Sequence, residues 1–240
     1  MRTPAREASA AEAAHLPPGR GERFAGYGVM GLPFASGHVL AMRRFPASSV
    51  GPAYTSVWHR DPAGAWTFHQ DRPDDQSCAR YFSNALDGSR RATIDLSWPS
   101  DRVLRIAIPE VDLEWTATLA ATPVTRALNL VGRAMPERMW RSRAVLRALG
   151  PVAGRALGAA KVGLVGTTPN GQQFVANPRT MWVIPESRAR LADCDFGPPG
   201  PLATQARLGD FWIPQRGVFA VGRAFFEPVP AGGARNDGDR

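Results

Sequence analysis

The sequence lacks most of the signals that would identify a function directly. Of its 29 basic side chains one, Lys161, is lysine and all others are arginine. Its two cysteines, Cys78 and Cys194, lie far apart and without the spacing of a zinc site, a pattern typical of a cytoplasmic protein with reduced thiols. No apolar run approaches the roughly 18–20 residues that a membrane-spanning helix needs. We therefore expect no transmembrane segment.

Nucleotide-binding and hydrolase motifs are also missing. The spacing Gly-x-Gly-x-x-Gly occurs from Gly26 to Gly31, but a segment typical of disorder precedes it and Leu32-Pro33 follows. A dinucleotide site needs a strand before the glycines and a helix after them. The sequence contains no phosphate loop, nucleophile elbow or kinase motif. It therefore leaves any cofactor unknown.

The positive charge is concentrated in one segment. Residues 126–155 carry seven arginines against one acid, Glu137, a net charge of +6 out of +8 for the whole chain. The near absence of lysine indicates a compositional bias rather than selection for phosphate binding. Basic stripes interleaved with stacking aromatic residues are not evident, so we expect no nucleic-acid partner.

Short apolar stretches between Gly and Pro turns predict a mainly β protein. The strand candidates are 37–45, 53–60, 65–71, 93–98, 103–108, 113–119, 173–176, 180–184, 188–192 and 218–226. This pattern is typical of an antiparallel barrel or sandwich. We expect a single β-rich domain over 23–227, with disordered tails at 1–22 and 228–240.

The period changes to a helical one between residues 123 and 159. Pro123, Pro136 and Pro151 each suit the first turn of a helix, and Gly150 suits a helix end. The segment therefore predicts an inserted pair or trio of short helices. They would form a cap docked on the barrel, a lid, or a peripheral membrane contact through 126–155.

A hairpin over residues 54–71 carries the most polar candidate site. The turn Asp61-Pro62-Ala63-Gly64, with a bulge at Gly64, would place His59 opposite Thr67. One face then carries Trp58, Trp66 and Phe68, and the other carries His59, Asp61, His69 and Asp71. The polar face is either a solvated outer surface or a catalytic site with a base and its carboxylate, including a metal-dependent form.

Two further side chains are candidates for function. Arg223 interrupts an apolar strand, so it is either paired with an acid such as Asp210 or Glu227, or it anchors the anionic head of a ligand. Cys78, next to Arg80, is either a nucleophile or a quiet buried thiol, and the burial typical of free cysteine favours the thiol.

The stretches Val57-Trp58-His59-Arg60-Asp61-Pro62-Ala63-Gly64-Ala65-Trp66 and Leu113-Glu114-Trp115-Thr116-Ala117-Thr118-Leu119 resemble the lipocalin-like β-barrel family that includes carotenoid hydratases and related isoprenoid-binding proteins. The resemblance implies a barrel with a hydrophobic cavity. We therefore expect the protein to bind a small apolar or amphiphilic ligand, with Trp58, Trp66, Phe68, Trp115 and Arg223 as binding residues. Two alternatives are an enzyme using the His/Asp face and a protein-interaction module presenting the basic helices.

Overall fold

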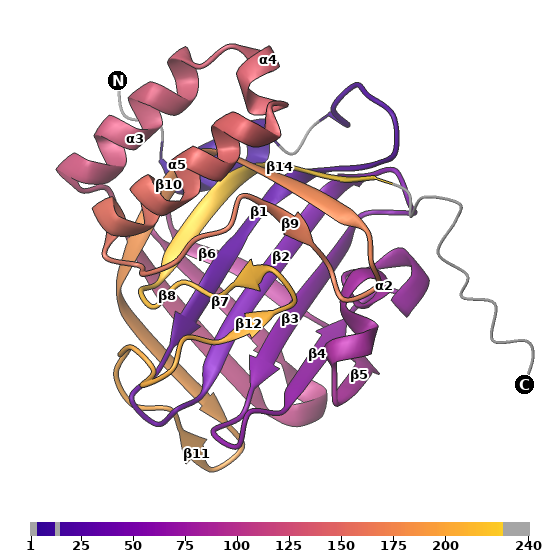
Figure 1. Ribbon diagram of the computed structural model, residues 1–240. Helices are drawn as coiled ribbons and strands as arrows, with labels where there is room; N and C mark the ends of the chain where they lie inside the picture. Colours follow the sequence, from indigo (N-terminus) through magenta and orange to yellow (C-terminus); the bar gives the residue numbers. More distant parts are fainter. Residues whose placement is uncertain (1–3, 13–14, 228–240) are drawn as a thin grey trace, which may run out of the picture.

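The largest feature of the protein is one strongly curled sheet (Figure 1). The computed structural model describes residues 4–12 and 15–227. Along the sheet the strands follow the order β5 (Gly88–Arg91), β4 (Trp66–Gln70), β3 (Tyr54–Arg60), β2 (Val39–Ser48), β1 (Glu22–Pro33), β14 (Val218–Glu227), β10 (Gln173–Leu191), β8 (Leu113–Ala120), β7 (Val103–Ile108) and β6 (Asp95–Ser100). Neighbours on this path are antiparallel except β4 and β5.

Four shorter strands complete the β structure. β9 (Val165–Thr167) and β11 (Cys194–Asp195) pair with β10, and β12 (Arg207–Leu208) pairs with β13 (Phe211–Trp212). The mainly β fold with inserted helices that the sequence predicts is therefore confirmed. The three strands predicted between 173 and 192 are one long strand, β10. Register shifts after Pro178 and between Val183 and Glu186 let this strand tolerate its prolines.

The concave side of the curl is a solid apolar core. Met42 and Val57, from β2 and β3, share one buried cluster with Ile106 and Trp115, from β7 and β8. Because the two halves of the sheet meet in this cluster, the interior of the curl is filled by side chains. A second aromatic cluster, which includes Trp58, covers the other face of β2, β3 and β4.

Three helices form a cap at one end of the sheet (Figure 1). They are α3 (Pro123–Ala134), α4 (Glu137–Trp140) and α5 (Arg143–Leu157), and we call residues 123–157 the helical cap. Thr122 caps α3 as a capping box with Thr125. Pro151 does not begin a helix as predicted, because α5 continues through it. Gly150 lies inside the same helix, where a Cβ would come 2.5 Å from the carbonyl oxygen of Val162, so it serves close packing.

The N-terminal segment differs from the predicted tail. Residues 1–22 include a helix, α1 (Ala5–Glu12), and the first residue of β1. Ala5 and Ser9 are buried, and Ala5 packs in the apolar core, which orders the described part of this segment. The tail predicted at 228–240 lies outside the described residues.

A small helical segment lies beside β4 and β5. It consists of the 3-10 turns Asp74–Gln76 and Ser83–Ala85 around α2 (Ala79–Phe82), and a third 3-10 turn, Pro109–Val111, precedes β8. None of the helices in the described residues has the length and apolar character that crossing a bilayer requires.

Candidate functional site

A largely apolar cavity of about 200 Å³ lies between the sheet and the helical cap. The sheet strands β1, β2, β3, β10 and β14 line it together with Cys78 and α2, and α3, α4, α5, the segment 162–164 and β13 line it from the other side. Its volume is below the roughly 300–1,000 Å³ usual for drug-sized ligands. The cavity therefore suits a small molecule, or a larger one that extends through an opening.

Two paired glycines form part of the cavity wall on the sheet side. Gly26 of β1 pairs with Gly222 of β14, and both line the cavity. A Cβ at Gly26 would come 2.0 Å from the carbonyl oxygen of Arg44, and one at Gly222 would come equally close to that of Asn177. Glycine is therefore required by the approach of neighbouring strands. The glycine spacing that the sequence shows at 26–31 lies within a strand and serves packing.

Polar contacts hold the cap over this wall. Asn129 of α3 donates its amide to the carbonyl of Met181 at 3.0 Å and accepts from the Met181 N–H at 2.8 Å. Glu137 of α4 forms ion pairs with Arg179 of β10 and with Arg223 of β14. The cap is thus fixed to β10 and β14 by directional bonds at two places.

Arg43 is the most unusual polar side chain of the cavity wall. It is 5 % exposed, and its guanidinium donates to the carbonyl oxygens of Val29, Met30 and Met42. It also lies over the ring of Trp58, 4.6 Å from the ring centroid. No ion pair of Arg43 with a carboxylate occurs within the described residues.

Burial lowers the pKa of Arg43 to about 10, which still leaves the guanidinium charged at neutral pH. Backbone carbonyls solvate this charge but do not neutralise it. A buried charge without a counterion is costly. The wall of the cavity therefore carries a positive charge that an anionic ligand group could compensate.

Asn177 of β10 is a second buried polar residue on the wall. It is 1 % exposed, and neither its side-chain oxygen nor its nitrogen has a hydrogen-bond partner among the described residues. An unpaired buried amide costs about 1–3 kcal/mol. A ligand with a hydroxyl, carbonyl or amide group could satisfy it.

Cys78 also lies against the cavity, as a buried thiol. It is 4 % exposed, and its sulfur lies 3.7 Å from the hydroxyl of Tyr54. Burial raises the pKa of Cys78, so its thiolate is disfavoured. The geometry is that of a quiet thiol, the reading that the sequence favours.

The cavity opens between the two long helices of the cap. Val131 of α3 and Val152 of α5 both line it, yet they are 55 % and 60 % exposed. Arg43, by contrast, is buried in the wall. We call the opening beside Val131 and Val152 the mouth.

The predicted ligand-binding residues are divided between several places. Trp58 and Arg223 line the cavity. Trp66 and Phe68 lie in the aromatic cluster around Trp58, and Trp115 lies in the core on the concave side. Arg223, which is half-buried, pairs with Glu137, a partner that the sequence reasoning did not consider.

The predicted hairpin register is correct: His59 lies opposite Thr67, so His59 and His69 share a face. The polar atoms of this face nevertheless bind separate partners. Asp61 accepts from the N–H groups of its own turn, and Asp71 accepts from the Thr55 N–H. Within the described residues, no three His, Cys, Asp or Glu side chains are placed to hold one metal ion.

His59 instead meets a residue that the sequence reasoning missed. Its Nε2 lies 2.9 Å from Nδ1 of His38, and Phe196 stacks on His38 at a ring distance of 3.9 Å. Burial, together with the neighbouring His38 and His69, lowers the pKa of His59 to about 4. The result is a neutral imidazole pair outside the cavity. Lys161 is exposed and lies over Trp212.

Neither a protein-family model nor a curated protein matches this sequence. Two solved structures are similar over much of their length. One is an acetoacetate decarboxylase from Legionella pneumophila, with 12 % identity, 89 % of this chain and 87 % of that chain covered, and a TM-score of 0.41. The other is titled as structural studies of acetoacetate decarboxylase, with 11 % identity, 89 % of each chain covered and a TM-score of 0.40.

At these values the likeness assigns no activity to this chain. The resemblance to lipocalin-like isoprenoid-binding proteins is not confirmed by the comparisons, whereas a curled β half-barrel is present.

Proposed function

We propose that the protein binds a small amphiphilic molecule with an anionic head in the cavity under the helical cap. The observation that carries this proposal is Arg43, a buried cation without a carboxylate partner in the described residues, on the wall of an apolar cavity. A carboxylate or phosphate would supply the missing countercharge through charge-assisted hydrogen bonds. The apolar part of the ligand would then lie along the walls toward the mouth.

Asn177 refines the ligand class. Its unpaired amide contains both a hydrogen-bond donor and an acceptor, and it lines the cavity, so a bound ligand could form hydrogen bonds with it. Strands β2 and β10 are separated by β1 and β14, which is about 14 Å across the sheet, and the register places Arg43 level with Met181, four residues along β10 from Asn177. A ligand that reaches both would carry a second polar group, such as a hydroxyl or keto oxygen, away from its anionic head.

The head group can be tested with octanoate and octanol, which share a chain length. A charge-assisted hydrogen bond contributes about 1.5–3 kcal/mol, so calorimetry should show octanoate binding about 10- to 150-fold more tightly than octanol. In Arg43→Met this preference should disappear. The matched control is Arg44→Met, which removes a guanidinium on the same strand that instead contacts Thr55 and Asp71 outside the cavity.

The location can be tested separately by filling the cavity. Ala153 of α5 lines it, whereas Ala148 of the same helix is exposed and does not. Ala153→Trp should abolish octanoate binding, and Ala148→Trp should leave it unchanged. Equal binding by both tryptophan variants, or a preference for the acid that survives Arg43→Met, would contradict the proposal.

A further inference from the structure

We propose that the helical cap is a docking surface for anionic lipid bilayers, and that the mouth of the cavity opens within that surface. The docking part stands on the cap alone. The role of the mouth as a ligand entrance from the bilayer rests on the proposed function, because it requires that a ligand enters the cavity.

The first observation is exposed apolar surface on both long helices. Leu130 of α3 is 70 % exposed, and Val131 and Val152 beside the mouth are more than half exposed. Met139 of α4 is also exposed. Val131 and Val152 line the cavity, and Leu130 and Met139 lie on α3 and α4 of the same cap. Several exposed large apolar side chains on one element are unusual on a surface that only water covers.

The second observation is the charge around these side chains. None of the seven arginines of the cap forms an ion pair within the described residues. The one acid, Glu137, is already held by Arg179 and Arg223 from the sheet. The positive charge of the cap therefore exceeds the acidic charge available to it within the described residues.

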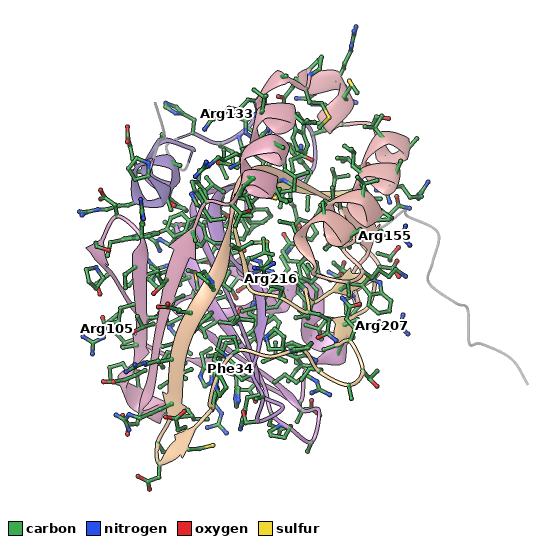
Figure 2. All side chains as sticks on the ribbon, turned by 90° about the vertical axis from the view of Figure 1, so that its left-hand side faces the viewer. Phe34, Arg105, Arg133, Arg155, Arg207 and Arg216 are labelled. Atoms are coloured by element: carbon green, nitrogen blue, oxygen red, sulfur yellow. The ribbon has the colours of Figure 1, made fainter. Side chains whose placement is uncertain are left out.

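The helical spacing combines the two features. Arg126, Leu130 and Arg133 follow one another at intervals of four and three residues on α3, and Val152 and Arg155 are three apart on α5, so each set shares a helix face. Figure 2 shows Arg133 and Arg155 on the cap and Arg105 away from it, on the strands at the lower left of the view. Apolar side chains flanked by arginine are the composition of helices that lie in the surface of an anionic membrane.

A bilayer fits these observations better than a nucleic acid. A polyanion would pair with the arginines but would not bury Leu130, whereas an anionic bilayer would pair with the arginines and bury Leu130. Amphiphiles also partition into bilayers, so a mouth at that surface would give them a route to the cavity without crossing water.

The test is flotation of the whole protein with phosphatidylcholine vesicles that contain or lack phosphatidylglycerol. We expect binding only to the anionic vesicles. Each arginine near such a surface contributes about fivefold, so Arg133→Gln with Arg155→Gln should weaken binding about 25-fold. Leu130→Asn should weaken it about tenfold or more, because it removes a leucine side chain that the bilayer would bury. The control pair, Arg105→Gln with Arg188→Gln, makes the same change in net charge on exposed strand residues and should bind normally.

Several outcomes would overturn the proposal: no binding to anionic vesicles, equal loss in the control pair, or insensitivity to Leu130→Asn. Binding of single-stranded DNA that competes with vesicles and ignores Leu130→Asn would instead identify a polyanion site. A dimer that Leu130→Asn dissociates would identify a contact between two copies. Octanoate affinity measured in solution on the same variants separates the two proposals, because the docking variants should retain it.

Discussion

Replacing Asn177 by leucine should stabilise the protein, although it removes a polar group from a candidate binding site. The side chain is 1 % exposed, and both of its polar atoms lack partners among the described residues. Because an unsatisfied buried polar group costs about 1–3 kcal/mol, Asn177→Leu should raise the free energy of unfolding by about 1–2 kcal/mol. For a domain of this size that corresponds to about 2–8 °C in Tm.

Asn129 is a matched comparison, because its replacement by leucine should change the free energy of unfolding in the opposite direction. Its amide makes two hydrogen bonds to Met181, at 3.0 Å and 2.8 Å. Asn129→Leu removes both bonds and leaves two backbone groups of a buried residue unpaired, so it should destabilise the protein by about 2 kcal/mol or more. Urea unfolding followed by tryptophan fluorescence measures both variants.

The sign of the Asn177 effect is the decisive result. If Asn177→Leu destabilises the protein as much as Asn129→Leu does, the amide is satisfied by ordered water, and the reasoning that it awaits a ligand fails. Stabilisation by Asn177→Leu together with weaker binding of a hydroxylated ligand would be the exchange of stability for function expected at a binding site.

Two further predictions concern the cap and the thiols. Burial raises the pKa of Glu137, but its bonds to two arginines lower it more, so its contribution to stability should be present above about pH 4.3 and be lost as the pH falls through its lowered pKa. Since its side chain is 44 % exposed, Glu137→Gln should lower the free energy of unfolding by about 0.5–1 kcal/mol at pH 7 and by almost nothing at acid pH, where the carboxylate is protonated. Equal losses of stability at both pH values would refute the ion-pair account. In the native protein a thiol reagent should modify exposed Cys194 and spare buried Cys78, and two rapidly reacting thiols would contradict the burial of Cys78.

The local parts of the fold were predictable from sequence. The turn at Asp61–Gly64 depends on a proline and on glycine at φ +106°, so its residues alone set the register that places His59 opposite Thr67. The same holds for the start of the helical cap, where Pro123 is the first residue of α3. In these cases neighbouring residues determine the structure.

The cavity was not predictable, because distant segments create it. In β2 the residues Val39, Ala41 and Arg43 alternate on one face, which hints that Arg43 is buried, but that strand looks short and mixed in the sequence. Nothing local shows that the helical cap covers the wall that includes Asn177. A barrel interior was the natural place to expect a ligand, and here side chains such as Trp115 fill it.

The pairing of β1 with β14 has a consequence for how the chain folds. Glu22 lies opposite Phe226, so strands almost the whole described chain apart form the middle of the sheet. Until β14 is made, β1 to β5 have no hydrogen-bonded link to β6, β7, β8 and β10. Contacts of such long range predict slow folding. During synthesis the edges of β1 and β10 would stay unpaired until β14, the last described strand, is made and pairs with both.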